Sequence, residues 1–470
     1  MSDKKELVII GAGPGGYAAA FYAADLGMNV TLIDKEINPG GVCLYRGCIP
    51  SKALLHVSKL LSEAKESANW GIDFGKPKID LDKLRAYKDS VVSKLTSGTG
   101  QLSKQRKINY IQGTATFSGS NSLTVQKVDG TTEELEFAKA ILSTGSIPST
   151  IPGLPDSSKI WDSTTALNLE LIPKKLLVVG GGYIGLELGS VYASLGSKVT
   201  VVEMTNGLLP GADRDLVRVL QRSLENKFES ILLNTKVSEF IEVKSGIKVK
   251  FEGSEQTSEE TFDRILVSVG RRPVTEGLGL DNTTVKISER GFVQIDEKCQ
   301  TNDSSIFAIG DIVGGAMLAH KASAEGKVAV DAILGKKVAF EPNAIPAVVF
   351  TDPELAWAGL NETEAKEKGI KVEVARFPWG ASGRATTIDR NDGLTKLLID
   401  PDTERILGMG LVGAGAGEMI AEGVLAVEMA ALAKDVALSI HPHPTLSETV
   451  MEASEVFYGH STHLYRSKRK

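Results

Sequence analysis

Cysteine is scarce in this sequence, with three residues among 470. Secreted domains that rely on a disulfide framework carry many more, so the sequence favours a reducing, cytoplasmic compartment. A disulfide in such a compartment serves chemistry rather than stability, and we expect any disulfide of this chain to do so. Only one strand-like stretch, Leu7–Ile10, precedes the first glycine loop, so we expect no cleavable targeting segment.

Long apolar runs and an excess of one charge are also missing. Glycine or charged residues interrupt every run before the roughly 20 apolar residues of a membrane helix, so we expect no membrane attachment. The formal net charge is −6 and the lysines and arginines are dispersed, which argues against a nucleic-acid partner. The one basic cluster, residues 466–470, is typical of a solvated tail, and we assign it no function.

What the sequence does contain is an internal duplication. An apolar strand, a glycine loop, an Ala-rich helix and a second strand occur in both LVIIGAGPGGYAAAFYAADLGMNVTLID and LLVVGGGYIGLELGSVYASLGSKVTVVE. The spacing from Gly11 to Asp34 equals that from Gly180 to Glu203. Both segments are typical of the βαβ unit of a Rossmann-like dinucleotide-binding domain. The uninterrupted apolar strands predict parallel strands covered by helices on both faces.

A chain of 470 residues is too long for one hydrophobic core and predicts several domains. Three prolines in residues 146–155 predict a linker, VSVGRRP ends the second unit, and the composition changes beyond Pro346. The expected fold class is α/β, with two Rossmann-like dinucleotide-binding domains and a C-terminal α+β dimerisation domain. We expect the domains to cover residues 1–150 and 151–274 (one dinucleotide-binding unit each), 275–345 (central) and 346–470 (interface).

Local patterns predict further elements in the later part of the chain. The stretches FVQID, IFAIGDI, KVEVARF and LTKLLID are strand-like. Asn361, followed by Glu364 and closed by Gly369, predicts a capped short helix. A longer apolar helix is expected from about Met419 to Ala433.

The first glycine loop predicts a phosphate site. Gly11, Gly13 and Gly16 permit a tight turn and bring bare N–H groups and a helix N-terminus to a pyrophosphate, while Asp34 accepts from a ribose hydroxyl. The alternative is a plain turn, which the flanking strand, helix and acid disfavour.

The second loop, Gly180, Gly182 and Gly185, predicts a second dinucleotide with Glu203 as its ribose ligand. A carboxylate there repels the 2′-phosphate of NADP, so NAD is favoured. The alternative for Glu203 is an exposed carboxylate at a strand end.

Between the two loops lies the cysteine motif GGVCLYRGCIPSK, with Cys43 and Cys48. If a helix starts near Cys48, its positive end and Lys52 stabilise a thiolate there. Spacing alone leaves open two inert thiols or half of a metal site. No second cysteine pair completes a zinc site, and Cys299 is solitary, so we expect no metal.

A histidine motif, HPHPTLSE, lies near the C-terminus. His443 is a candidate general base, oriented by Glu448 through its second ring nitrogen. The alternative for Glu448 is structural, because Thr445 and Glu448 match a capping box. A metal bound by His441 and His443 is disfavoured, since no acidic or thiol partners flank them.

These motifs, in this order, resemble those of the class I pyridine nucleotide–disulfide oxidoreductases, and the resemblance covers essentially the whole chain. The cysteine motif is similar to the sequence GGTCLNxGCIPSK of the branch that oxidises dihydrolipoamide, with departures at Val42, Tyr45 and Arg46. MLAHKASAEG and HPHPTLSE are similar to the flavin-side helix and the base motif of that branch. The departures leave both cysteines in place, so they affect tuning rather than reaction class.

The resemblance implies a role for each reactive side chain. Cys43 would be the interchange thiol, and Cys48 would form the thiolate beside FAD. Lys52 would pair with Glu187 near the reactive nitrogen of the flavin. Tyr183 would cover the nicotinamide pocket, Asp311 would bind the ribityl chain and His320 would lie near the pyrimidine edge of the flavin. The cofactor-binding residues implied for FAD and NAD are Gly11, Gly13, Gly16, Asp34, Lys52, Gly145, Gly180, Gly182, Tyr183, Gly185, Glu203, Gly270, Asp311, Met317, Leu318, Ala319 and His320.

The implied reaction converts dihydrolipoamide and NAD to lipoamide and NADH through FAD. The implied assembly is a homodimer whose C-terminal domain completes the active site of the partner subunit. We expect the lipoyl group on a separate protein, an acyltransferase of a 2-oxo acid dehydrogenase complex or the glycine-cleavage carrier. Glutathione reductase would favour NADP, mercuric reductase would need a C-terminal cysteine pair, and a transhydrogenase of this fold usually lacks the paired cysteines. A flavin-containing scaffold without activity would not need every reactive residue.

Overall fold

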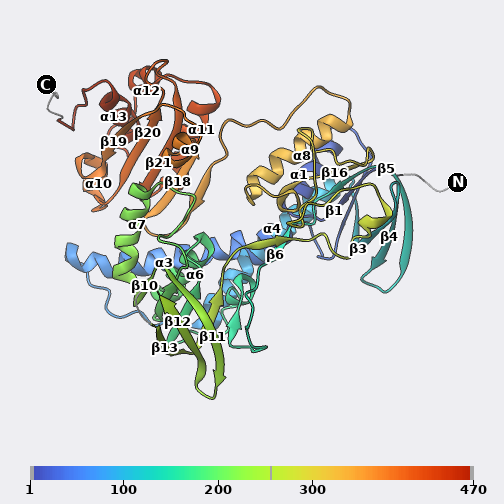
Figure 1. Ribbon diagram of the computed structural model, residues 1–470, viewed down its shortest axis with the longest axis horizontal. Helices are drawn as coiled ribbons and strands as arrows, with labels where there is room; N and C mark the ends of the chain where they lie inside the picture. The colour runs from blue at the N-terminus through green and yellow to red at the C-terminus, as the bar shows by residue number, and fades with distance from the viewer. Residues whose placement is uncertain (1–4, 254–256, 466–470) are drawn as a thin grey trace.

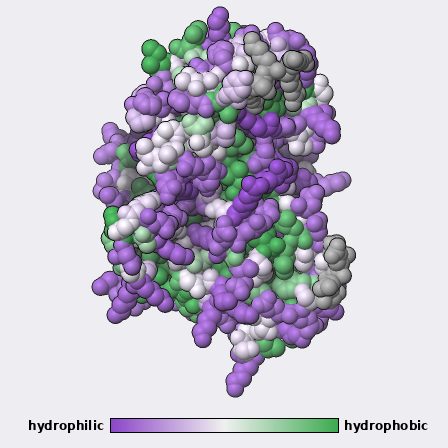
Figure 2. Space-filling view, turned by 90° about the vertical axis from the view of Figure 1, so that its left-hand side faces the viewer, coloured by the Kyte–Doolittle hydropathy of each residue, from purple (hydrophilic) through white to green (hydrophobic). Residues whose placement is uncertain are grey.

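The computed structural model describes residues 5–253 and 257–465. Figure 1 shows units built on separate sheets, with the C-terminal unit at the upper left and the N-terminal unit at the right. On the face that Figure 2 shows, hydrophilic residues cover most of the surface and hydrophobic residues form separate patches. Among the described residues, no helix has both the length and the apolar character to cross a bilayer. The basic cluster at 466–470 lies outside the described residues.

The first unit contains the first glycine loop. Its strands are β1 (Lys5–Ile10), β2 (Val30–Asp34), β3 (Asn109–Gly119), β4 (Ser122–Lys127), β5 (Thr132–Leu142) and β16 (Ile306–Ala308). β3, β2, β1, β5 and β16 lie side by side in parallel, and β4 pairs antiparallel with parts of β3 and β5. β1 and β2 are almost wholly buried, as their apolar sequences predict. Because β16 pairs with β5, the segment after the second unit returns to complete the first sheet.

Helices from distant parts of the chain close the first unit. Its helices are α1 (Pro14–Asp25), α2 (Gly41–Arg46), α3 (Cys48–Glu66), α4 (Leu81–Gln105) and α8 (Ala319–Ile333), with 3-10 turns η1 (Ser67–Trp70), η2 (Leu280–Asn282) and η3 (Gly310–Val313). α1 packs against α8. A Cβ at Gly15 would lie 3.0 Å from the Cβ of Ala322, so this close approach requires glycine.

The second unit repeats this plan around the second glycine loop. Its elements are β7 (Ile160–Trp161), α5 (Ser163–Ala166), β8 (Lys175–Val179), α6 (Tyr183–Leu195), β9 (Lys198–Val202), α7 (Arg214–Lys227), β10 (Ser230–Leu232), β11 (Thr235–Val243), β12 (Gly246–Gly253), β13 (Thr257–Phe262) and β14 (Arg264–Val267). The parallel sheet has the order β10-β9-β8-β14-β7, and β11, β12 and β13 form an antiparallel sheet. Two Rossmann-like units are therefore confirmed.

The connection between the two units is a paired ribbon rather than a free linker. The predicted linker begins with β6 (Ser146–Pro148), which pairs antiparallel with β15 (Arg271–Pro273). The chain enters the second unit through β6 and leaves it through β15. Backbone hydrogen bonds between the two strands fix where the second unit starts and ends, which a proline-rich sequence does not reveal.

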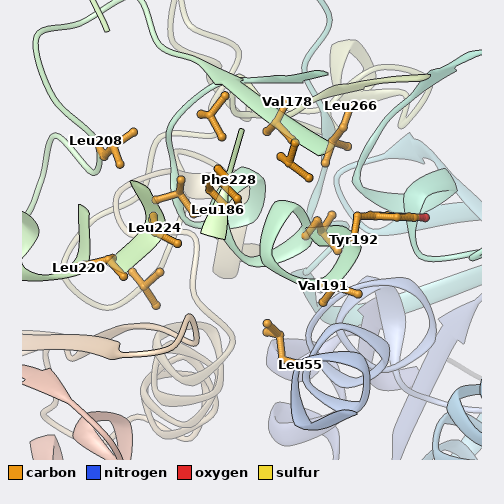
Figure 3. Close-up of a cluster of buried hydrophobic side chains, with 14 of the residues drawn as sticks. Leu55, Val178, Leu186, Val191, Tyr192, Leu208, Leu220, Leu224, Phe228 and Leu266 are labelled. Carbon is orange, nitrogen blue, oxygen red and sulfur yellow. The ribbon is translucent and has the colours of Figure 1, made fainter. Parts of the chain in front are cut away.

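Apolar packing fixes α3, the helix that starts at the second cysteine, against the second unit. Figure 3 shows Leu55 of α3 facing Val191 and Tyr192 of α6, within a cluster that also includes Val178 and Leu266. Leu55 is 8% exposed, and such burial of a leucine side chain contributes about 1.5–3 kcal/mol. This contact sets the distance between the first turns of α3 and α6, where reactive side chains lie.

The C-terminal unit is α+β, as predicted. Its elements are β17 (Ala347–Val349), β18 (Glu354–Gly359), α9 (Glu362–Glu367), β19 (Glu373–Pro378), η4 (Trp379–Ala381), α10 (Gly383–Thr387), β20 (Leu394–Ile399), β21 (Ile406–Gly413), α11 (Ala416–Glu428), α12 (Ala433–Leu438) and α13 (Glu448–Phe457). The antiparallel sheet has the order β17-β18-β21-β20-β19. The side chain of Asn361 accepts the Glu364 N–H at 2.8 Å, so the predicted cap of α9 is confirmed.

Two local predictions are wrong. FVQID forms no strand and contributes only an isolated bridge between Ile287 and Val293, because its N–H groups bond alternately to the Ile312 and Lys286 carbonyls. The helix expected to reach Ala433 ends at Glu428 as α11. The chain then turns through Ala430, whose φ is +53°, and Ala433 starts a separate helix.

A buried ionic cluster joins the second unit to the C-terminal unit. Lys396 of β20 is wholly buried, and its Nζ lies 2.8 Å from both Asp213 and Asp215 at the start of α7. Lys396 also bonds Glu362, and Arg376 bonds Asp215 at 2.6 Å. These contacts lower the pKa of Asp215 although burial acts to raise it. The carboxylates depend on Lys396 and Arg376 for compensation of their charge.

Replacing Lys396 with methionine should therefore destabilise the protein strongly. Removing one partner of a buried ion pair costs about 3–5 kcal/mol, because the remaining charges lose their partner. The matched control is Lys371→Met, since Lys371 is exposed and pairs only with the exposed Asp402. In urea unfolding followed by tryptophan fluorescence, the urea concentration at the midpoint should be much lower for Lys396→Met than for the wild type. It should be almost unchanged for Lys371→Met. Equal midpoints would contradict the assigned importance of the cluster.

Candidate active site

A cavity of about 860 Å³ lies between the first and second units. Its lining combines Asp34 at the end of β2, Cys48 at the start of α3, Tyr183 at the start of α6 and Asp311 in η3. Cofactor pockets commonly have volumes of about 300–1,000 Å³. The cavity therefore has room for a dinucleotide cofactor beside a cysteine.

The first glycine loop is shaped for close approach of a phosphate. Gly11 has φ of +95°, and a Cβ at Gly16 would lie 1.9 Å from the Gly11 carbonyl oxygen. A Cβ at Gly13 would meet nothing within 4 Å, so the space beside the N-terminus of α1 is open. Asp34 accepts the N–H groups of Ala12 at 2.6 Å and Glu36 at 3.0 Å. Burial raises the pKa of Asp34, although the bond from the Ala12 N–H opposes the rise.

The second loop repeats this geometry outside the cavity. Gly180 has φ of +109°, a Cβ at Gly185 would lie 2.4 Å from the Gly180 carbonyl oxygen, and a Cβ at Gly182 would meet nothing. Glu203 accepts the N–H groups of Gly181 at 2.7 Å and Thr205 at 2.8 Å. None of Gly180, Gly182, Gly185, Glu203 and Gly270 lines the cavity, so this loop offers a separate phosphate and ribose site.

The cysteine motif folds into two consecutive helices that meet at Gly47. A Cβ at Gly47 would lie 2.9 Å from the Val42 carbonyl oxygen, so glycine permits the sharp junction. Cys43 and Cys48 are free thiols, which is the reduced form of the predicted disulfide. The pKa of Cys48 is lowered to about 7, mainly by a hydrogen bond from Cys43; burial opposes this shift, and the charge of Lys52 favours it. The pKa of Cys43 is raised by the same hydrogen bond and by burial.

Lys52 and Glu187 form an ion pair against the cavity. Lys52 Nζ lies 2.7 Å from Glu187 Oε2, and Glu187 is 3% exposed. Ser51 Oγ donates to the same carboxylate at 3.2 Å, and the Phe350 N–H donates to Oε1 at 2.9 Å. Lys52 also lies 4.6 Å from the centre of the Phe350 ring. Sequence patterns gave no signal for Phe350, because its contact comes from the C-terminal unit.

A polar group in the ribbon between the units was also missed. Arg271 of β15 donates to Ser146 Oγ at 2.7 Å and lies 3.9 Å from Asp311, which Ser146 also bonds. All three line the cavity together with Tyr183, whose pKa burial raises to about 12. The motif that contains Arg271 predicted only a domain boundary. Its pairing across the ribbon is what brings the guanidinium to the site.

Only some of the cofactor-binding residues predicted at and before the start of α8 line the cavity. Met317 and Ala319 line the cavity, as does Gly145, whereas Leu318 and His320 do not. The ring of His320 instead bonds the Pro346 carbonyl oxygen through Nε2 at 2.8 Å. Lys321 and Glu325 form a buried ion pair of 2.5 Å, and Glu325 accepts the Gly310 N–H at 2.7 Å. This pair holds the backbone that carries Asp311.

His443 and Glu448 form a pair remote from this cavity. His443 Nδ1 lies 2.9 Å from Glu448 Oε1, and the Thr445 N–H donates to Oε2 at 2.8 Å. The carboxylate therefore orients His443 and also accepts the Thr445 N–H. The predicted capping box does not form, because α13 starts at Glu448 itself, with Ser447 as its N-cap and no side-chain cap. The His443 side chain is 70% exposed and does not line the cavity. Its free Nε2 is available to a molecule outside this chain.

The candidate metal site among the described residues lies apart from this cavity. The described residues contain one group of three acids close enough to hold an ion, Asp213, Asp215 and Glu362. Lys396 and Arg376 already bond these carboxylates.

Comparisons with known proteins agree with this geometry. Proteins named dihydrolipoyl dehydrogenase are 47% identical over 467 residues in Vibrio parahaemolyticus and 46% identical over 468 residues in Haemophilus influenzae. Each alignment covers 99% of this chain and 98% of the relative. The solved structure of LpdA from Mycobacterium tuberculosis has a TM-score of 0.89 at 26% identity and covers 96% of this chain and 99% of its own. The Cu(II) complex of the HOCl-induced flavoprotein disulfide reductase RclA from Escherichia coli has a TM-score of 0.86 at 29% identity and covers 97% and 99%.

Family models account for most of the sequence. The model described as pyridine nucleotide-disulphide oxidoreductase matches residues 5–326, and the model of the dimerisation domain of that family matches residues 345–454. The chain has two glycine loops of the dinucleotide-binding type and a cysteine pair at the cavity beside the first of them, and it belongs to the pyridine nucleotide-disulphide oxidoreductase family.

Proposed function

We propose that this enzyme oxidises a protein-bound dihydrolipoyl group to its cyclic disulfide and reduces NAD to NADH. The observation that carries the proposal is the Cys43 and Cys48 pair, which opens on a dinucleotide-sized cavity with Lys52 beside it. Full-length relatives named dihydrolipoyl dehydrogenase support the choice of substrate.

The cavity and the two loops fit FAD and NAD. Asp34, Gly13 and Asp311 would hold FAD in the cavity, and Gly182 and Glu203 would hold NAD at the second loop. Asp34 and Glu203 each accept two backbone N–H groups and keep lone pairs for a ribose hydroxyl. When bound, FAD would supply the two-electron chemistry that links the Cys43 and Cys48 dithiol to NAD.

The residues of this chain perform the thiol chemistry. His443 accepts a proton from one substrate thiol at Nε2, while Glu448 holds its Nδ1–H. The substrate thiolate then attacks Cys43, which breaks the Cys43–Cys48 bond and leaves Cys48 as a thiolate. The second substrate thiol loses its proton to solvent and displaces Cys43, whose sulfur takes the proton from His443. This step yields the cyclic disulfide, a Cys43 thiol and the Cys48 thiolate. Lys52 and the N-terminus of α3 stabilise the Cys48 thiolate.

We propose that residues 1–150 and 275–345 hold FAD, residues 151–274 hold NAD, and residues 346–470 form the interface of a homodimer. The dimerisation-domain match supports the interface, as do large exposed apolar side chains in and after α11. They include Leu425, Met429, Leu438 and Ile440, of which Ile440 is 99% exposed. The lipoyl group would arrive on an acyltransferase of a 2-oxo acid dehydrogenase complex or on the glycine-cleavage carrier. A reducing cytoplasm suits a chain with only three cysteines.

The direct test is turnover of dihydrolipoamide with NAD by the purified, FAD-loaded protein. We expect NADH formation with dihydrolipoamide and none with reduced glutathione, because the second thiol of dihydrolipoamide is held on the same molecule, whereas a monothiol needs a second molecule to resolve the mixed disulfide. Turnover of glutathione instead of dihydrolipoamide would contradict the proposed substrate.

Glu203 should make the enzyme prefer NAD to NADP. Its carboxylate would repel the 2′-phosphate of NADP, and such like-charge contacts cost several kcal/mol, which corresponds to a preference of about 10²-fold or more in kcat/KM. Glu203→Gln removes the charge but keeps the side-chain length, so the preference should narrow mainly through a better kcat/KM for NADP. The FAD content serves as the control, because Glu203 lies outside the cavity. An unchanged preference would show that Glu203 does not face the ribose.

A further inference from the structure

The helix that carries Glu448 also carries the carboxylate of a second histidine–carboxylate pair, whose histidine lies in the segment after the helix. Glu452 is one turn further along α13, and residues four apart share a face of a helix. His463 Nδ1 lies 2.5 Å from Glu452 Oε1, and Ser461 Oγ donates to the other oxygen. Glu452 is 3% exposed and the His463 ring is 52% exposed. This arrangement repeats that of His443 and Glu448.

The chain after α13 is folded back to make this contact. Gly459 has φ of +80°, which reverses the chain direction directly after the helix. Tyr458 donates to Glu404 at 2.6 Å and stacks on the ring of His460, which anchors the turn. His463 is therefore held on Glu452 by an ordered segment.

We propose that His463 is a positioning residue that, through Glu452, controls how readily the base His443 takes up a proton. The inference rests on the proposed function, in which His443 must be neutral to accept a substrate proton. A proton on His463 places a positive charge near the first dyad and disfavours a second one on His443. When His463 is neutral, the anionic Glu452 favours protonation of His443.

The charge of His463 already reaches the first dyad. Burial acts to raise the pKa of Glu448, but the Thr445 N–H, His443 and His463 together hold it below its usual value. The like charges of Glu448 and Glu452, one turn apart, would otherwise raise the proton affinity of both. When protonated, His463 thus offsets the negative charge that Glu452 places near His443.

Neighbouring groups do not replace His463 in this role. α13 packs against β19, β20 and α12. Of their charged residues, Arg376 and Lys396 bond Asp215, and Asp435 bonds the Leu432 N–H. The remaining charged residues on these elements and on α13 are Glu373, Lys434 and Glu455. Carboxylates and amines keep their charge near neutral pH, so the histidines are the groups whose charge changes there.

Two other histidines lie near, and both are engaged elsewhere. His441 is buried and bonds Glu422 at 2.9 Å, whereas His460 stacks on Tyr458. His463 is the histidine whose carboxylate partner shares the helix face of Glu448. His460→Gln is therefore a matched control for a substitution at His463.

The test compares the acid limb of the pH dependence of kcat/KM for dihydrolipoamide in holoenzyme variants. His463→Gln removes the side chain whose positive charge disfavours protonation of His443. The acid limb should therefore move to higher pH by about half a unit. His463→Lys supplies a permanent cation, so the limb should move to lower pH by a similar amount. His460→Gln should leave it in place, and raised salt should shrink both shifts.

Opposite signs distinguish a charge effect from a structural one. If both His463 substitutions leave the limb fixed or move it in the same direction, the proposal is overturned. Absence of dihydrolipoamide turnover in the unmodified enzyme would instead overturn the proposed function, so the two failures are distinguishable. Flavin absorbance and gel filtration of each variant exclude loss of cofactor or of assembly.

Discussion

Replacing Cys48 with serine should lower dihydrolipoamide turnover by more than about 10⁴-fold, the scale seen when a member of a concerted catalytic unit is removed. Without its sulfur no intramolecular disulfide can form, so the enzyme has no bridge to accept electrons from the substrate. Replacing Cys43 with serine should abolish turnover as completely. The rate alone does not separate the roles of the two cysteines.

A spectrum separates them, because only one sulfur is proposed to lie beside the flavin. On addition of two electrons the wild-type protein should gain long-wavelength absorbance from a Cys48 thiolate against oxidised FAD. The Cys43→Ser variant keeps that thiolate and should show the band, whereas Cys48→Ser should lack it. Since the pKa of Cys48 is lowered to about 7, the band should be present above pH 7 and fade as the pH falls below it.

Cys299→Ser is the matched control for this pair of variants. Cys299 is buried, its Sγ lies 3.8 Å from the Glu325 carbonyl oxygen, and burial raises its pKa to about 12. Its replacement should keep both the band and the turnover. Reduction of an artificial one-electron acceptor by NADH bypasses the disulfide and should survive in all three variants. A band that persists in Cys48→Ser would contradict the assignment of the long-wavelength absorbance to the Cys48 thiolate.

The parts of the site that were predictable are those whose chemistry is local in sequence. The turn at Gly11 and the acid at Asp34 belong to one strand–loop–helix–strand unit, so their spacing already fixes their proximity. The same holds for Gly180 and Glu203. The pKa of Cys48 likewise depends on one short motif, mainly on the hydrogen bond from Cys43 and then on Lys52, one turn into the helix that starts at Cys48.

The parts that were not predictable depend on contacts between distant segments. Phe350 reaches Glu187 because the C-terminal unit returns to α6, and Arg271 reaches Asp311 because β15 pairs with β6. Neither contact leaves a periodic or spaced pattern in the sequence. The strand prediction for FVQID was wrong for a related reason. An alternating pattern indicates a possible strand, but a strand also needs a neighbouring segment that pairs with it along its length.

Mixed dimers should recover activity that neither parent possesses. The structure gives the reason: His443 is exposed and absent from the cavity that holds Cys48, so one chain does not bring base and disulfide together. Figure 1 shows α13 at the upper left and α1 and β1 at the right. A twofold axis would bring each base to the disulfide of its neighbour and create two equivalent sites.

The experiment uses two inactive proteins, Cys48→Ser and His443→Gln, which are dissociated, mixed equally and reassembled. Random assortment makes about half of the dimers mixed, and each mixed dimer has one intact site and one doubly damaged site. Recovered activity should therefore be about a quarter of that of wild type reassembled in the same way. Gel filtration of differently tagged chains establishes that mixed dimers have formed.

The control mixture combines Cys48→Ser with Cys43→Ser. Each chain then has a defect in its own cysteine pair, so both sites of a mixed dimer lack a disulfide and the mixture should stay inactive. If the mixture of Cys48→Ser with His443→Gln is equally inactive although mixed dimers are present, base and disulfide belong to one subunit or His443 is not the base. Because His443 is 70% exposed in the isolated chain, the first of these outcomes would require the C-terminal unit to move against the ionic cluster that joins it to the second unit.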